Sequence, residues 1–326
     1  MESIYERIQA AVQPDGTLPE DFSIQPEPEN PKALRFADGA QDGIVFYHSG
    51  GRGDGALLEK LKEITRLAAG GADFEETHAQ LAACFGEWDG MLGCVDGLQA
   101  WIIQHREELD PNRIFRFANA VLLRSGSIGA VKYALSVLEL LAAASGEWRE
   151  TVRALALSDE LTLYCVFVAG RWDNSSEELF SMAQRVRGWG RVHAVRELEP
   201  ATPEMRDWLL DEGWQNDVLP AYTALRCARS GELRRRLEEE TLSRERLDAA
   251  DGLIQALLDE GPVQNISLLE DGEELLLAWL DQLERVSPNE EDQNTLRYLR
   301  EECGDRDWPQ VEARTRALLE GPYHGA

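Results

Sequence analysis

From Ala56 onward, apolar residues recur at intervals of three and four positions. The first such face consists of Leu57, Leu58, Leu61, Ile64 and Leu67. This spacing brings apolar side chains to one side of a helix. The pattern continues almost to the C-terminus, in segments separated by glycine, proline and acidic residues. The chain is therefore predicted to be a succession of short amphipathic helices.

Several of these predicted helices begin with a capping sequence. Asp110-Pro111 and Thr202-Pro203 each place a capping side chain before a proline, whose missing N–H costs nothing at the first helical position. Asp73 followed by Glu76 resembles a capping box. Gly213 marks a helix end, where glycine is favoured. These signals predict where several of the helices begin and end.

The N-terminal part follows a different pattern. Residues 13–31 are rich in proline and acidic side chains, which disfavours helix. Two short apolar runs, residues 34–37 and 43–48, flank the turn-rich residues 38–42, as in a β-hairpin. We therefore expect three parts. These are a proline-rich arm with a β-hairpin over residues 1–55, a helical array over 56–286, and capping helices over 287–326.

The helical part shows faint internal similarity. Residues 209–213 recur as residues 257–261, a spacing close to the ~40–47 residues of HEAT and armadillo repeats. Residues 190–213, in which Ala194-Val195-Arg196 precede Pro203, resemble units of the HEAT-like helical repeat superfamily over about residues 110–285. The resemblance implies an all-α fold in which an α-α superhelix follows the hairpin. Most such folds bind protein partners, and a few related ones are lyases or glycosylases.

Composition and charge narrow the classes of partner. The formal net charge of −27 and pI of about 4.6 argue against nucleic-acid binding, which depends on basic residues. The longest apolar run, residues 161–170, is about half of the ~20 residues that a membrane span needs, and the start lacks a secretion signal. Five cysteines at irregular spacing indicate reduced thiols without a disulfide framework. We expect a cytoplasmic protein that binds neither nucleic acid nor membrane.

Basic side chains gather in one stretch of the nearly neutral middle third. They are Arg187, Arg191, His193 and Arg196, with Arg185 before them. Guanidinium groups suit carboxylates and phosphates, so some of these side chains are candidates for an anion-binding pocket. The competing interpretation is that they pair with neighbouring carboxylates such as Glu197 and Glu199.

A second candidate site lies next to the predicted hairpin. Gly51, Arg52 and Gly53 belong to a G-x-G-x-x-A sequence between a predicted strand and a predicted helix, the order in which a dinucleotide is held. No second parallel strand follows, so a flexible connection is the competing interpretation. Tyr47 and His48 would be the nearest polar groups of a pocket for a nucleotide or pigment-type ligand.

Two of the nine tryptophans lie in predicted loops. Trp172 and Trp214 are therefore candidates for a binding surface, whereas the others are expected in the core. The sequence shows no metal-binding spacing of histidines or cysteines and no catalytic motif. We therefore expect a non-enzymatic module without cofactor or metal that presents a concave helical surface to a protein or peptide. The alternative is a small-ligand protein or enzyme using the Tyr47 pocket.

Overall fold

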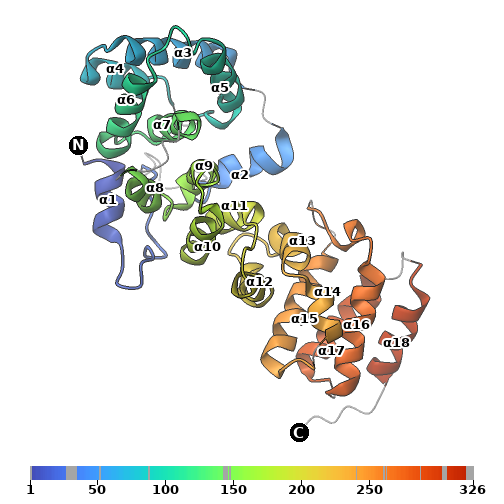
Figure 1. Cartoon of the computed structure of the whole chain (residues 1–326). Helices are drawn as coiled ribbons and strands as arrows, with labels where there is room; N and C mark the ends of the chain where they lie inside the picture. The colour runs from blue at the N-terminus through green and yellow to red at the C-terminus, as the bar shows by residue number, and fades with distance from the viewer. Residues whose placement is uncertain are drawn as a thin grey trace. The chain divides into compact units, whose positions relative to one another are not determined.

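The computed structural model describes residues 2–26, 35–50, 53–86, 89–141, 146, 148–239, 241–259, 261, 263–286, 288–302 and 307–320. All regular secondary structure within these ranges is helical, from α1 to α18 with short π-helical and 3₁₀ turns (Figure 1). The prediction of a nearly all-helical chain is thereby confirmed. The residues divide into two compact units, 1–197 and 198–326, and each is described by itself.

The predicted N-terminal β-hairpin is wrong, because the structure has no strand among the described residues. Residues expected to form its turn and second strand instead form helix α2 (Ala40–Ile44) and the π-helical turn η1 (Val45–Ser49). Gly39, with φ of 76°, leads the chain into α2, and residue 34 lies outside the described ranges. The β-branched and aromatic residues favour a strand locally. Tertiary contacts outweigh this preference, since Phe46 packs against Phe167 and His193.

The N-terminal unit is built around α7. Besides α2, its helices are α1 (Ile4–Ala11), α3 (Gly55–Gly70), α4 (Phe74–Ala82), α5 (Val95–Gln104), α6 (Pro111–Arg124), α7 itself (Ile128–Leu141), α8 (Trp148–Leu155), α9 (Asp159–Ala169), α10 (Ser175–Arg185) and α11 (Trp189–Glu197). Helix α7 packs against α4, α5, α6 and α9, and every residue from 129 to 138 is buried. A helix that is apolar on nearly all sides is stable only in such a central position.

The C-terminal unit consists of helices that pack in a regular order (Figure 1). They are α12 (Pro203–Trp208), the π-helical turn η3 (Leu209–Gly213), α13 (Ala221–Ser230), α14 (Leu233–Glu239), α15 (Arg244–Leu258), α16 (Gly272–Arg285), α17 (Glu290–Glu302) and α18 (Pro309–Glu320). From α13 onward, each helix contacts the second helix after it: α13 with α15, α14 with α16, α15 with α17, and α16 with α18. Trp279 on α16 is fully buried at the centre and donates from Nε1 to Asp251 on α15 at 2.6 Å.

The predicted capping signals are confirmed where the structure describes them. Asp110 accepts hydrogen bonds from the backbone N–H of Asn112 at 2.9 Å and of Arg113 at 3.2 Å, and α6 begins at Pro111. Thr202 caps α12 in the same way before Pro203. None of the four described cysteines forms a disulfide, and Cys303 lies outside the described residues. No described helix is long and apolar enough to span a membrane.

Candidate functional site

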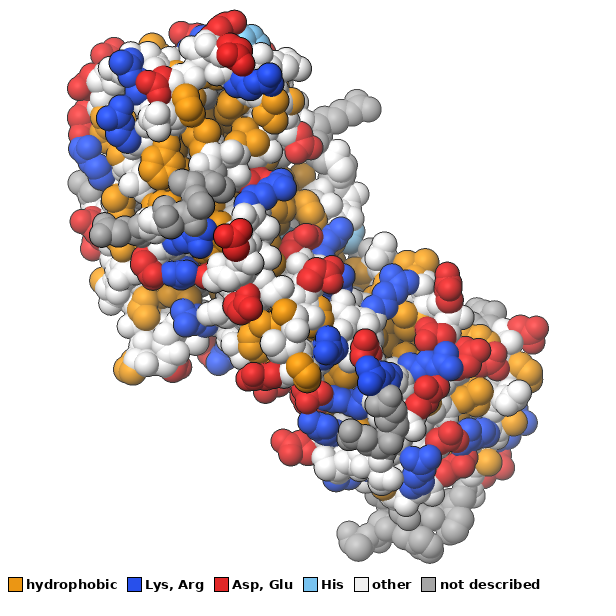
Figure 2. Space-filling view, viewed as in Figure 1, with side chains coloured by type: hydrophobic (Ala, Val, Ile, Leu, Met, Phe, Trp, Pro, Cys, Tyr) orange, Lys and Arg blue, Asp and Glu red, His pale blue; other side chains and the backbone are white. Residues whose placement is uncertain are grey.

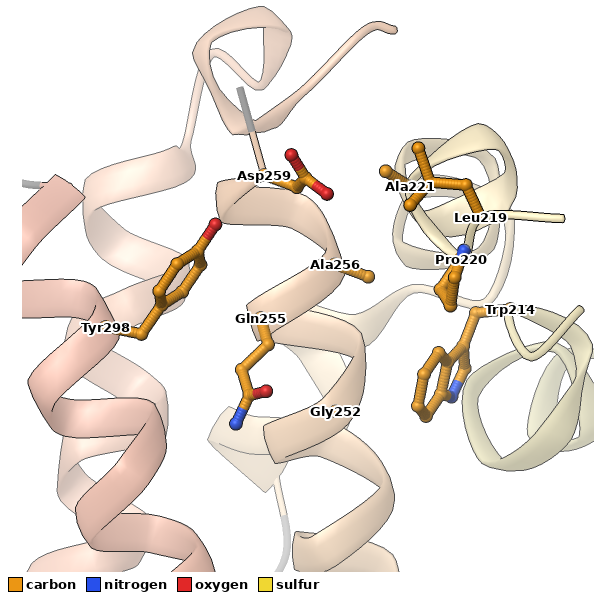
Figure 3. Close-up of a pocket in the computed structure, with 9 residues that line it drawn as sticks. All are labelled: Trp214, Leu219, Pro220, Ala221, Gly252, Gln255, Ala256, Asp259 and Tyr298. Atoms are coloured by element: carbon orange, nitrogen blue, oxygen red, sulfur yellow. The ribbon is translucent and has the colours of Figure 1, made fainter. Parts of the chain in front are cut away.

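A groove of about 300 Å³ lies on the C-terminal unit. Its lining residues come from three segments of that unit, and they are Trp214, Leu219, Pro220, Ala221, Gly252, Gln255, Ala256, Asp259 and Tyr298 (Figure 3). Residues 252, 255, 256 and 259 follow the i, i+3, i+4, i+7 spacing of one helix face. One face of α15 therefore forms the floor of the groove. The segment from residue 214 to 221 forms one wall, and Tyr298 on α17 forms the other.

The floor is hollow because two of its residues are small. Ala256 leaves space that a larger side chain would fill, and Gly252 lets the ring of Trp214 approach the helix closely, whereas Leu253 and Leu257 of α15 are fully buried in the core. Glycine in a helix interior costs about 1 kcal/mol relative to alanine. Gly252 is nevertheless required here, since a Cβ atom on it would lie only 2.8 Å from Cζ2 of Trp214.

Trp214 is held against the floor by packing. It follows directly after η3, and π-helical turns occur frequently at functional sites. Its indole Nε1 is buried and has no hydrogen-bond acceptor among the described residues. The orientation of the ring therefore depends on its fit against Gly252, and the ring forms part of the groove wall (Figure 3).

Three polar side chains complete the groove. Gln255 donates from its amide nitrogen to the hydroxyl oxygen of Thr295 at 2.6 Å, which links α15 to α17. Asp259 follows the last residue of α15, and its Oδ1 accepts from the backbone N–H of Gly261 at 2.9 Å. Tyr298 stands across α15 from Trp214 (Figure 3). The polar groups thus lie on the floor and the α17 side, while the opposite wall is mostly apolar.

Among the described residues that line the groove, Asp259 is the only charged one. No lysine or arginine among the described residues forms an ion pair with it, although other carboxylates of this unit are paired, as Asp271 is with Arg234 at 3.3 Å. Acidic and basic side chains alternate over the visible face of the C-terminal unit (Figure 2). Residues 201–326 nevertheless hold 14 basic and 29 acidic side chains. The described lining of the groove therefore carries a net negative charge and belongs to an acidic part of the chain.

Of the two tryptophans predicted to lie on a binding surface, only Trp214 lines the groove. Trp172 is 4% exposed, and its ring lies 5.7 Å from that of Trp148 in an edge-to-face arrangement. The guanidinium carbon of Arg149 lies 4.6 Å from the Trp172 ring centroid. Trp172 thus belongs to the packing of the N-terminal unit.

Two of the predicted anion-binding arginines contact groups of their own unit. Arg187 pairs with Glu20 at 2.8 Å. Nε of Arg191 donates to the backbone oxygens of Ala183 at 3.1 Å and Val186 at 2.8 Å, close to the end of α10. These contacts match the competing interpretation of the basic stretch, in which its side chains pair within the molecule.

The structure brings His193 and Arg196 together with Tyr47 of the second predicted site. The Tyr47 ring stacks on His193 with 5.9 Å between centroids, and Trp189 lies at the same distance from the histidine ring. The guanidinium carbon of Arg196 lies 4.8 Å from the Tyr47 centroid. We call Phe46, Tyr47, Trp189, His193 and Arg196 the His193 cluster. His48, the other polar residue of the second predicted site, follows Tyr47 directly in sequence.

The His193 cluster is closed at its centre. His193 is 1% exposed, and burial lowers its pKa to about 3, so that the imidazole is neutral at physiological pH. Neither ring nitrogen has a hydrogen-bond partner among the described residues. A neutral ring shielded from solvent contributes no positive charge to an anion site. The centre of the cluster, at His193, is therefore packed and shielded from solvent.

The structure also differs from the arrangement that was predicted for the nucleotide site. Gly51 and Arg52 lie outside the described residues. Gly53 is described, and its Cα approaches the backbone of Gly93 closely enough that a Cβ atom would overlap it. The residues before this sequence form η1 and not a strand, so the strand–glycine–helix order that a dinucleotide requires is missing.

A buried ionic cluster in the N-terminal unit has no recognisable motif in the sequence. Nζ of Lys132, on α7, lies 2.7 Å from a carboxylate oxygen of Asp42, 2.9 Å from one of Asp89 and 2.6 Å from one of Glu160. Burial raises the pKa of Asp42 to about 6. Lys132 partly offsets this rise, and the nearby carboxylates of Asp89 and Glu160 add to it. The three carboxylates raise the pKa of Lys132 in spite of its burial, so it stays charged. A single lysine within the apolar residues 128–141 was the available signal.

One group of carboxylates has the spacing to hold a cation. Oxygen atoms of Asp248, Asp251 and Asp292 lie within 4.8 Å of one another on α15 and α17. Oxygen ligands of this kind suit Mg²⁺ or Ca²⁺. The guanidinium group of Arg244 lies among them, however, with contacts of 2.5 Å to Asp292 and 2.6 Å to Asp248. Arg244 therefore supplies the positive charge that a metal ion would bring.

Comparison with known proteins gave no match: no protein-family model, no curated protein and no solved structure shows significant similarity to this chain.

Proposed function

We propose that this protein is a non-enzymatic helical binding module whose C-terminal unit takes up a segment of a protein or peptide partner at the α15 groove. The observation that carries the proposal is the groove itself, with Trp214 held in its wall by Gly252. Tryptophan is enriched among residues that dominate binding energy, especially where it lines a preformed pocket. A groove whose shape is set by packing loses little conformational entropy on binding.

The order of helix contacts supports the same proposal. In the C-terminal unit each helix from α13 to α16 contacts the second helix after it, which is the pattern that stacked helix pairs produce. Proteins of stacked helices present surface grooves between adjacent helices. The α15 groove lies between such neighbours, since its walls come from the segment leading into α13 and from α17.

The chemistry of the groove favours binding over catalysis. Its nine described lining residues include no histidine, cysteine, serine or lysine, and among them only Asp259 and Tyr298 carry an ionisable side chain. Its volume lies at the lower end of the roughly 300–1,000 Å³ typical of small-molecule sites. A groove of this size suits one side chain of a peptide better than a large cofactor.

The proposal is tested by selecting peptides from a displayed random library on the wild-type protein and on Ala256→Leu. Leucine at this position fills the groove floor without lowering helix propensity appreciably. We expect the selected peptides to bind wild type with micromolar affinity and to bind Ala256→Leu at least tenfold more weakly. The matched control is Ala79→Leu, which enlarges an exposed alanine on α4. Equal binding to wild type and Ala256→Leu, or no enrichment on wild type, would contradict the proposal.

A further inference from the structure

The aromatic side chains of the α15 groove suit a cation. Trp214 and Tyr298 stand on opposite sides of the α15 floor (Figure 3). The faces of aromatic rings carry negative potential and attract ammonium and guanidinium groups. The alkyl part of a lysine or arginine side chain can at the same time cover the apolar surface of Leu219, Pro220 and Ala256.

The charge at the groove also favours a cationic occupant. Asp259 brings a carboxylate, and one of its oxygens accepts only a backbone N–H, that of Gly261. This residue also follows the C-terminal end of the 15-residue helix α15, where the unsatisfied carbonyl groups add partial negative charge. The nine described lining residues carry no positive charge that would offset either contribution.

Other occupants fit less well. An anionic side chain would be repelled by Asp259 and by the acidic unit around it. A neutral apolar side chain would displace water from the carboxylate without replacing its hydrogen bonds, which is unfavourable. A cationic side chain meets both the aromatic surface and the carboxylate.

We infer that the α15 groove accepts the cationic side chain of a basic residue of the partner, with arginine preferred to lysine. The inference rests on the proposed function, because it names the occupant of the same groove. Arginine is preferred because its planar guanidinium group stacks on an indole ring and is less strongly hydrated than an ammonium group. Asp259 is then the counter-ion, and Trp214 and Tyr298 form the aromatic sides.

The inference is tested with N-acetyl-arginine methylamide and its neutral counterpart, N-acetyl-citrulline methylamide, which has nearly the same shape. Binding is followed by two-dimensional ¹H–¹⁵N NMR of the full chain, using the backbone signals of Gly252 and Trp214. We expect saturable shifts with millimolar affinity for the arginine compound and about tenfold weaker binding of the citrulline compound. Lysine should bind between the two.

Three variants separate the effect of the groove's charge from that of its shape. Asp259→Asn keeps the oxygen that accepts from Gly261, and it should remove the preference for arginine over citrulline. Glu274→Gln, which neutralises an exposed carboxylate on α16, should keep that preference. Trp214→Ala should weaken binding of both compounds.

The possible failures differ for the two proposals. If citrulline binds as tightly as arginine, or if Asp259→Asn keeps the preference for arginine, the cationic occupant is wrong. The binding-module proposal then stands as long as Ala256→Leu abolishes peptide binding. If neither compound shifts the groove signals and Ala256→Leu leaves peptide binding unchanged, both proposals are wrong.

Discussion

Replacement of Lys132 by methionine tests whether the buried ionic cluster holds the N-terminal unit together. Methionine is an unbranched apolar side chain of similar length that lacks the ammonium group. It leaves the carboxylates of Asp42, Asp89 and Glu160 without the charge that lies within 2.9 Å of each of them. The side chains of Asp42 and Glu160 are only 7% and 6% exposed, so water cannot replace the lost contacts.

The expected loss follows from the burial of the carboxylates. Removing one partner of a buried ion pair costs about 3–5 kcal/mol, because the other charge stays buried. The variant can limit the loss by protonating Asp42, whose pKa is already about 6. At pH 7 that protonation costs about 1.4 kcal/mol per unit of difference between pH and pKa. We therefore expect Lys132→Met to lower the free energy of unfolding by about 3–5 kcal/mol at pH 7.

The loss should be smaller in acid. The pKa of Asp42 is higher in the variant than in wild type, since the ammonium group of Lys132 no longer stabilises its ionised form. Asp42 is then protonated more readily as the pH falls, and a neutral carboxyl group costs less to bury than an ionised one. At pH 5 the difference between Lys132→Met and wild type should therefore be clearly smaller than at pH 7.

The assay is urea unfolding followed by far-UV circular dichroism at both pH values. The curves are fitted with a separate transition for each compact unit, because a single two-state transition is not expected of two units. The control is Lys60→Met, an exposed lysine on α3, for which we expect a change within about 0.5 kcal/mol. A loss below about 1 kcal/mol at pH 7, or an equal loss at pH 5 and pH 7, would refute this account of the cluster.

Three further predictions concern single residues. Burial raises the pKa of Asp42 from 3.8 to about 6, so the folded state binds more protons than the unfolded state between these values. Wild type should lose stability from this group as the pH rises from about 4 to 6, and a thermal-melting series should show this component missing in Asp42→Asn. The pH dependence of stability that His193 contributes has the opposite sign, because burial lowers its pKa from 6.5 to about 3. Stability from His193 is present above pH 6.5 and is lost as the pH falls toward 3. His193→Phe should abolish that loss and raise the melting temperature, since it removes two buried nitrogens without partners; a lower melting temperature at pH 7 would contradict this. Gly252→Ala should destabilise the C-terminal unit and alter tryptophan fluorescence, because the new methyl group overlaps Trp214. In a Trp214→Ala background the same change should stabilise by about 0.5–1 kcal/mol, and a double-mutant cycle that shows no such reversal would exclude the packing argument.

The sequence by itself determined the helical character of the chain and many helix starts. Apolar spacing and capping residues act within a few positions of one another, so Asp110-Pro111 and Thr202-Pro203 could be recognised without knowledge of the fold. Trp214 could be named as a candidate because it follows Gly213 outside the predicted helix. The four floor residues of the groove also follow a helical spacing that is visible in the sequence. Nothing in the sequence indicated, however, that these four residues line a groove.

Only the tertiary structure decided which side chains meet. The residues predicted as a hairpin form helical turns because Phe46 and Tyr47 pack on His193 and because Asp42 reaches Lys132, and no local propensity contains that information. The α15 groove likewise depends on Trp214 and Tyr298, which lie far apart in sequence and reach one helix face only after folding. Local preferences are worth fractions of a kilocalorie per residue. A buried charge or a packed indole contributes several times as much, and the contacts between distant residues therefore set the sites of this protein.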